Sequence, residues 1–213
     1  MKQTYLIYGI LAVITSIVIY FFLTGYTRSI DPTEKLVTAQ KAIFSSKGWA
    51  FREEINFTST RLIITGNVDL EHNILNTTMV KLENGFPSLT LTFANRTGTY
   101  ANIEGGWIKI GDGWAPEQTI LYKLFTLATE SSSKTYRTYD TSTHIFFEDN
   151  CSSSCKDLFN TLESLASSKG IQPEKYIGIV RIEKEGVKTI YLEFLGGKTT
   201  ICSLIYSIES IKS

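Results

Sequence analysis

The sequence has few of the residues that build catalytic and metal sites. Only two of its 213 residues are histidine and three are cysteine. His72 and His144 lie far apart and do not form an H-E-x-x-H pair, and no C-x-x-C, G-x-S-x-G or phosphate-loop motif is present; GGKTT at Gly196 lacks the upstream glycine. We therefore expect that the protein is not an enzyme and has no cofactor or metal site.

An excess of charge of either sign is also missing. Lys plus Arg and Asp plus Glu number 21 each, and the isoelectric point is near 6.7. A nucleic-acid-binding surface needs clustered basic residues, so this balance predicts no nucleic-acid partner. The charge runs Arg52–Glu54 and Glu183–Glu185 are typical of the solvated face of strands.

One long segment has no charge at all. The apolar run Tyr5–Leu23 lies within an uncharged stretch, Gln3–Thr27, which as a helix would cross the roughly 30 Å hydrocarbon layer of a membrane. We therefore predict a transmembrane signal anchor and short exit linker over residues 1–28, followed by one domain over residues 29–213. A cleaved signal peptide is the alternative, but such peptides usually have only about 7 to 15 apolar residues, and FFLTGYTRS offers no good cleavage site.

Two signals disagree about where the domain lies. Lys2 precedes the apolar run while Arg28, Lys35 and Lys41 follow it, and the positive-inside rule alone would leave the domain in the cytoplasm. Sequons for N-glycosylation favour the outside, because all four follow the run: Asn56, Asn76, Asn95 and Asn150. We expect a single-pass membrane protein with its C-terminal domain outside the cytoplasm.

The three cysteines allow one disulfide in an oxidising compartment. Cys151 and Cys155 are four residues apart, and Cys202 is an alternative partner for either of them.

Hydrophobic periodicity predicts three helices within a long series of strands. The helices are expected over Asp31–Gly48, Pro116–Glu130 and Cys151–Gly170, where caps and apolar stripes occur. Alternation of apolar and polar residues predicts about six antiparallel strands over 49–110, two over 134–148 and three over 176–208.

The stretch GGWIKIGDGW holds two of the three tryptophans. As a strand it places Trp107 and Lys109 on one side and Ile108 and Ile110 on the other, and Asp112-Gly113 is expected to supply the positive dihedral angles of a tight turn. The tryptophans either pack on the sheet or serve a ligand.

The order of elements resembles the LolA, LppX and LprG class of extracytoplasmic lipoprotein carriers. The resemblance is carried by the first helix running into GWAFREEINF, by RLIITGNVDL, by TYANIEGGWIKIGDGW and by the helix ILYKLFTLA. It implies an α+β fold in which a curved antiparallel sheet, a half-open barrel, is covered by about three helices around an apolar cavity. This chain departs from the class by having a predicted N-terminal transmembrane helix in place of a cleaved or lipid-modified N-terminus.

Two functions follow from this expected architecture. The first is a membrane-tethered binding module that holds a lipid or other apolar ligand in the concave face of the sheet. Its predicted lining is aromatic: Trp49, Phe51, Phe57, Phe93, Trp107 and Trp114. The alternative is a structural or assembly subunit of a cell-envelope complex, in which the same sheet is core and the sequon-bearing strands face glycans or protein partners.

Overall fold

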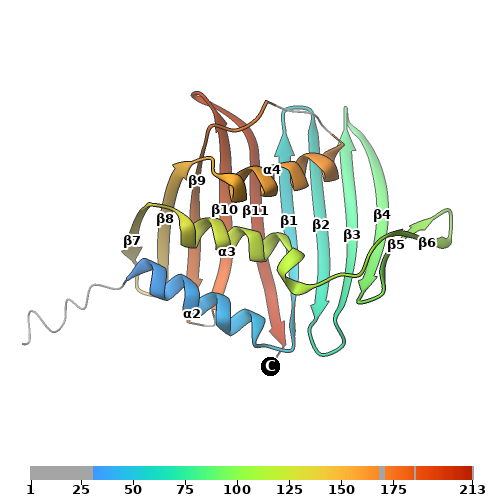
Figure 1. Ribbon diagram of the computed structural model, residues 1–213, viewed down its shortest axis with the longest axis horizontal. Coiled ribbons are helices and arrows are strands. Elements are labelled where there is room, and N and C mark those ends of the chain that lie inside the picture. The colour runs from blue at the N-terminus through green and yellow to red at the C-terminus, as the bar shows by residue number, and fades with distance from the viewer. Residues whose placement is uncertain (1–30, 168–170, 185, 213) are drawn as a thin grey trace, which may run out of the picture. The chain divides into compact units, whose positions relative to one another are not determined.

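The computed structural model describes residues 31–167, 171–184 and 186–212. From Pro32 onward they form one compact unit, in which three α-helices lie against one face of an eleven-stranded antiparallel sheet (Figure 1). The helices are α2 (Pro32–Phe44), α3 (Ile120–Glu130) and α4 (Ser153–Ala166), and a short 3₁₀ turn, η1 (Pro116–Gln118), precedes α3.

The strands occur where the alternation of apolar and polar residues predicts them. They are β1 (Gly48–Phe57), β2 (Thr60–Asp69), β3 (Ile74–Glu83), β4 (Phe86–Asn95), β5 (Gly98–Ile103), β6 (Gly106–Gly111), β7 (Ser133–Thr138), β8 (Ser142–Asn150), β9 (Lys175–Glu183), β10 (Gly186–Gly196) and β11 (Thr199–Lys212).

The sheet consists of two meanders, β1–β6 and β7–β11, which are joined where β1 pairs with β11. Its order is β6-β5-β4-β3-β2-β1-β11-β10-β9-β8-β7. The pairing of β1 with β11 brings Ile55 opposite Leu204 and Glu53 opposite Tyr206. Consecutive strands β6 and β7 consequently lie at opposite edges, and the chain between them crosses the sheet through η1 and α3 (Figure 1).

The helices begin and end at residues with clear local chemistry. Thr119 caps α3, because its hydroxyl accepts a hydrogen bond from the Tyr122 backbone N–H at 3.2 Å. Ser167 ends α4 in the left-handed conformation, with φ 52°. The predicted stop at Gly170 lies outside the described residues.

The core lies between the helices and the sheet. Trp49, Phe51 and Ile55 of β1 point to this side and are buried, as are Leu36 of α2 and Leu124 of α3. Burial of one such side chain contributes about 1.5–3 kcal/mol, so this layer supplies most of the favourable free energy of folding.

The expected fold class is wrong as stated, because it included a transmembrane helix. In the described part of the chain, no helix has both the length and the apolar character needed to span a membrane. The structure is instead a large antiparallel sheet with three helices. The run Tyr5–Leu23, on which that expectation rested, lies outside the described residues.

The predicted tight turn at Asp112-Gly113 is also wrong, because Gly113 does not have a positive φ. The β5–β6 turn instead uses Glu104 and Gly105, with φ 52° and 86°. Gly113 is needed for a close approach, since a Cβ there would lie 1.9 Å from the Arg96 carbonyl oxygen. The chain leaving β6 packs on the β4–β5 turn, where the Trp114 N–H donates to the Asn95 carbonyl at 2.8 Å.

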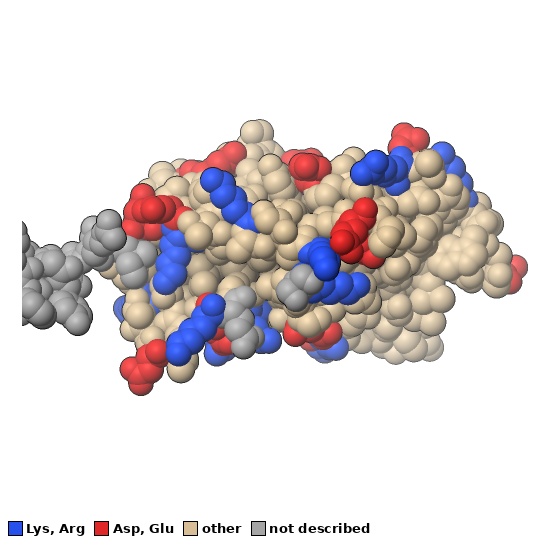
Figure 2. Space-filling view, turned by 90° about the horizontal axis from the view of Figure 1, so that it is seen from below, with Lys and Arg blue, Asp and Glu red and all other residues tan. Residues whose placement is uncertain are grey.

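One face of the molecule carries charged side chains of both signs, mixed together (Figure 2). Figure 2 shows the molecule from below the view of Figure 1, with acidic and basic groups scattered among each other on that face. The face shown has no broad patch of one sign to attract a polyanion.

Candidate ligand-binding site

The helices divide the sheet into two regions. Their contacts reach β7, β10, β1 and, through α4, β2. We call β7–β11, β1 and β2 with the three helices the covered part, and we call β3–β6, residues 74–111, the wing. The wing holds seven of the eleven exposed large hydrophobic side chains of the described residues, which makes it the candidate binding region. These seven are Phe86, Leu89, Leu91, Ile103, Trp107, Ile108 and Ile110.

The strand register places the wing's side chains on two faces. On the helix side, the face continues from the core through Leu75 and Met79, which pack against buried residues. It ends at Phe86, Ile103 and Ile108, which are 79%, 49% and 51% exposed. Between these two groups the same face carries Thr77, Thr90 and Thr92, so hydroxyl groups separate the exposed apolar side chains at the edge from the core.

On the opposite face, which we call the open face, side chains form two neighbouring rows across the strands. Paired residues define one row as Ala50, Asn67, Asn76, Phe93, Tyr100 and Lys109. The other row is Arg52, Thr65, Thr78, Leu91, Asn102 and Trp107. The open face of the wing thus combines amides, a hydroxyl and aromatic rings with Leu91 and, in the edge strand β6, Lys109.

Two hollows of the open face share residues. One of about 460 Å³ is lined by Asn76, Phe93, Asn95, Tyr100 and Trp107. A groove of about 320 Å³ also includes Asn76 and Trp107 and extends past Asn67 toward Glu209. A third hollow of about 330 Å³ lies on the open face of the covered part, beside Phe146, Ile179 and Tyr191.

The structure separates the six aromatic residues predicted to line one site. Trp49, Phe51 and Phe57 lie on the helix side of β1, and the first two are buried. Phe93 and Trp107 lie on the open face, with ring centroids 6.5 Å apart. As ligand contacts these residues stay a prediction, but they do not form one lining.

Trp114, the sixth, is buried in the core directly after β6. Among the described residues its indole Nε1 has no hydrogen-bond partner. A buried donor without an acceptor costs about 1–3 kcal/mol.

Strand alternation also corrects the interpretation of the Arg52–Glu54 run as solvated. Glu53 lies on the helix side and is 4% exposed, and burial raises the pKa of its carboxyl to about 8. Tyr206 lies opposite Glu53, and burial, then the Glu53 charge, raises the pKa of this phenol well above its ordinary value. The Trp49 indole donates a 2.9 Å hydrogen bond to the Tyr206 hydroxyl. This part of the core therefore contains the polar groups of Trp49, Glu53 and Tyr206 among its apolar side chains.

The four sequons occupy different surroundings. Asn56 lies half-buried in β1, and Asn150 is exposed at the end of β8. Asn76 and Asn95 both line the aromatic hollow. The Asn95 side-chain oxygen accepts from the N–H groups of Thr97 and Gly98 and from the Thr97 hydroxyl, which leaves the amide NH₂ as the group that Asn95 can offer a ligand.

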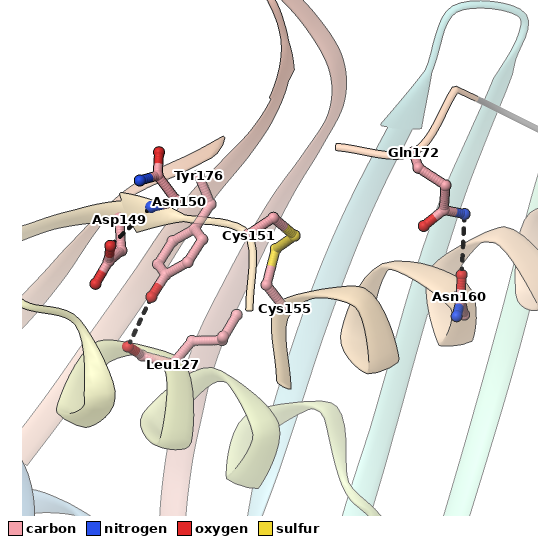
Figure 3. The surroundings of a disulfide bond; sticks show 8 residues. All are labelled: Leu127, Asp149, Asn150, Cys151, Cys155, Asn160, Gln172 and Tyr176. Carbon is pink, nitrogen blue, oxygen red and sulfur yellow. Dashed lines mark hydrogen bonds between the residues drawn. A yellow bond between two sulfur atoms is a disulfide. The ribbon is translucent and has the colours of Figure 1, made fainter. Parts of the chain in front are cut away.

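The structure selects one disulfide from the alternatives that the sequence leaves open. Cys151 and Cys155 are bonded, with Cα atoms 5.2 Å apart, and Cys202 is free and buried. Figure 3 shows the bond joining the chain after β8 to the first turn of α4. Nearby, the Tyr176 hydroxyl donates to the Leu127 carbonyl at 3.4 Å, which links β9 to α3 (Figure 3).

The histidines serve local contacts. His72 lies in the turn after β2, where its Nδ1 is 3.0 Å from Asp69 Oδ2, and this contact raises the pKa of His72 and lowers that of Asp69. The His144 ring packs against Tyr139. Within residues 31–167, 171–184 and 186–212, no three His, Cys, Asp or Glu side chains gather to hold a metal.

Several residues of the candidate region have no distinct sequence signal. Asn67, Thr78 and Tyr100 lie on the open face beside Trp107, but each reads as an ordinary residue of an alternating strand. Alternation predicts which side each occupies within its own strand. Their proximity depends on the pairing register of five strands, β2 to β6, which periodicity does not define.

The fold is that of a known group of proteins. No protein-family model and no curated protein sequence matches this chain. Among solved structures, it is similar to the crystal structure of LprF from Mycobacterium bovis, with a TM-score of 0.53, 8% identity, and coverage of 85% of this chain and 93% of that chain. LprF has a LolA/LprG-like lipoprotein fold, so the predicted resemblance is confirmed as architecture. At this identity the likeness establishes the fold alone.

Proposed function

We propose that the protein is a non-enzymatic binding module that holds a lipid or another apolar ligand against the helix side of the wing. The observation that carries the proposal is the exposure of Phe86, Ile103 and Ile108 on a face that elsewhere forms the core. Exposed apolar side chains gain free energy when a ligand removes them from water. The LprF-like fold supports the proposal, because the LolA, LppX and LprG class implies a sheet that receives an apolar ligand beside its helices.

We propose that the domain lies outside the cytoplasm. The Cys151–Cys155 disulfide supports this location, since such bonds persist in oxidising compartments and are rare in the cytosol.

The alternative is a structural or assembly subunit of a cell-envelope complex. The observation in its favour is that β6, whose side chains are largely exposed, forms one edge of the sheet. Its free backbone groups would pair with a strand of another chain.

Native mass spectrometry of the full chain, before and after extraction with organic solvent, tests the proposal. We expect a mass excess that extraction removes and that Ile108→Lys abolishes, because a charge there opposes an apolar ligand. Lys109→Ala, on the open face of the same strand, is the matched control and should keep the excess. An unliganded mass combined with an oligomer that Ile108→Lys dissociates would favour the structural subunit instead.

A further inference from the structure

The open face of the wing combines aromatic rings with side-chain amides. Phe93 lies 6.2 Å from Tyr100 and 6.5 Å from Trp107 between ring centroids, and Trp107 is 54% exposed. Asn76 pairs directly with Phe93 across β3 and β4, so its amide lies beside the rings. A ligand here meets flat apolar surfaces and hydrogen-bonding groups at once.

The two hollows form a continuous strip along this face. Asn76 and Trp107 line both, which connects the aromatic hollow to the groove along β2 and β3. Beyond Asn76, the groove presents Thr65, Asn67 and Thr78. Their combined extent, about 460 and 320 Å³, is in the range of sites for small organic ligands.

The charges of the strip define the class of ligand. Neither hollow is lined by Lys or Arg, and the one carboxylate, Glu209, lies at the far end of the groove. Lys109 pairs with Tyr100 on this face but lines neither hollow, so the lining itself offers phosphates and carboxylates no cation. A purely apolar ligand would bury the amides of Asn67 and Asn76 without partners, which is costly. The site fits a neutral molecule that presents many hydroxyls and also apolar C–H faces.

We propose that this strip binds a saccharide, with sugar rings stacked on Trp107 and Tyr100 and sugar hydroxyls bonded to Asn76, Asn95 and Thr78. This site differs from the apolar site on the helix side, and either one can exist without the other. The saccharide has two potential sources. It is a free glycan, or it is a glycan attached to Asn76, which begins the sequon Asn76-Thr77-Thr78 and is exposed in β3.

The first experiment tests the free glycan. The full chain, produced in cells without N-glycosylation, is applied to an array of immobilised mammalian, bacterial and plant oligosaccharides, and the strongest ligand is titrated. We expect Trp107→Ala to weaken its binding at least about tenfold, as for a central aromatic contact. Tyr139→Ala is the matched control, since Tyr139 is an aromatic residue of similar exposure, 50%, that follows β7 at the opposite edge of the sheet. It should change binding by less than about twofold.

The second experiment tests the attached glycan. The full chain is secreted from eukaryotic cells, its glycopeptides are mapped, and quenching of tryptophan fluorescence by acrylamide is measured. Trp49 and Trp114 are buried, so quenching reports on Trp107. We expect a glycan on Asn76, and we expect Asn76→Gln to increase quenching while Asn56→Gln, which removes the sequon in β1, leaves it unchanged.

The two experiments together decide the proposal. Array binding that Trp107→Ala removes supports a free glycan, and shielding of Trp107 that Asn76→Gln removes supports an attached one. The proposal is overturned if no oligosaccharide binds and Trp107 is quenched equally with and without a sugar on Asn76. Array binding that survives Trp107→Ala would also overturn it, unless Trp107 is shielded in the second experiment. Loss of the apolar ligand in Ile108→Lys bears only on the function proposed above.

Discussion

The covered part and the wing are built from the same kind of strand but differ in what lies on their faces. In β1, every second residue from Trp49 to Ile55 is buried beneath helices. In β4 half of the residues are exposed, and in β6 five of six are. Strand alternation is thus enough to form a sheet, while stability depends on a second layer that removes one face from water. The covered part contains most of the buried core and therefore contributes most of the stability. The wing is an exposed extension of the same sheet.

Two identical substitutions should separate the regions most strongly. Leu124→Ala in α3 removes a fully buried side chain and should lower the free energy of unfolding by about 2–5 kcal/mol. Leu89→Ala in β4, where the side chain is 65% exposed, should change it by less than about 0.5 kcal/mol. Chemical denaturation measures both. Equal losses would show that the wing is packed as firmly as the covered part.

The buried carboxyl of the covered part makes stability depend on pH. Glu53 has a folded-state pKa of about 8 against an ordinary value of 4.5. Between these values the folded state binds more protons than the unfolded state, so stability falls as pH rises. We expect the wild type to lose roughly 2 to 4 kcal/mol between pH 5 and pH 8, and Glu53→Gln to remove this loss.

Glu54 on the open face of the same strand supplies the control. Its hydrogen bonds to Arg61 and then to Arg52 lower the pKa of its carboxyl below 4.5. The stability that ionised Glu54 contributes is therefore lost only as the pH falls below its ordinary pKa. Glu54→Gln should follow the wild-type pH dependence between pH 5 and 8, and a Glu53→Gln variant that does the same would contradict the assigned pKa.

Reduction of the disulfide should have a smaller effect that is confined to the covered part. The Cys151–Cys155 bond closes a loop with a sequence separation of four, so its loss should cost at most about 2 kcal/mol. Hydrogen exchange with and without reductant should show faster exchange in α4 and unchanged exchange in β5 and β6. Faster exchange in the wing would mean that the two regions unfold together.

The smallest effect is expected at the boundary between the regions, in the turn joining β2 to β3. Asp69→Asn removes the carboxylate that raises the pKa of His72 and should return it toward 6.5. Glu71→Gln, which removes a weaker charge effect, should lower the pKa of His72 less. Titration by NMR compares the two variants, and a larger shift in Glu71→Gln would contradict the Asp69–His72 contact.

Local structure was largely predictable because it depends on neighbouring residues. The three helices were expected within a few residues of α2, α3 and α4, since capping residues and apolar stripes define them. Strand alternation likewise predicted that Trp107 and Lys109 share one side, which their pairing with Asn102 and Tyr100 agrees with. The prediction of a turn at Asp112-Gly113 was wrong because Gly113 is instead required by its close approach to the backbone of Arg96, a residue distant in sequence.

The sequence by itself therefore determined the helices and strands, which side chains of a strand share a face, and the resemblance to the LolA, LppX and LprG class. Only the tertiary structure decided that β1 pairs with β11, that Cys151 bonds to Cys155 rather than to Cys202, and that the helices pack mainly on the covered part. It also divided the six predicted aromatic residues between two faces and gathered Asn76, Tyr100 and Trp107 on one of them. The physical reason is that periodicity is a property of short segments, whereas register and helix cover depend on contacts between residues far apart in the chain.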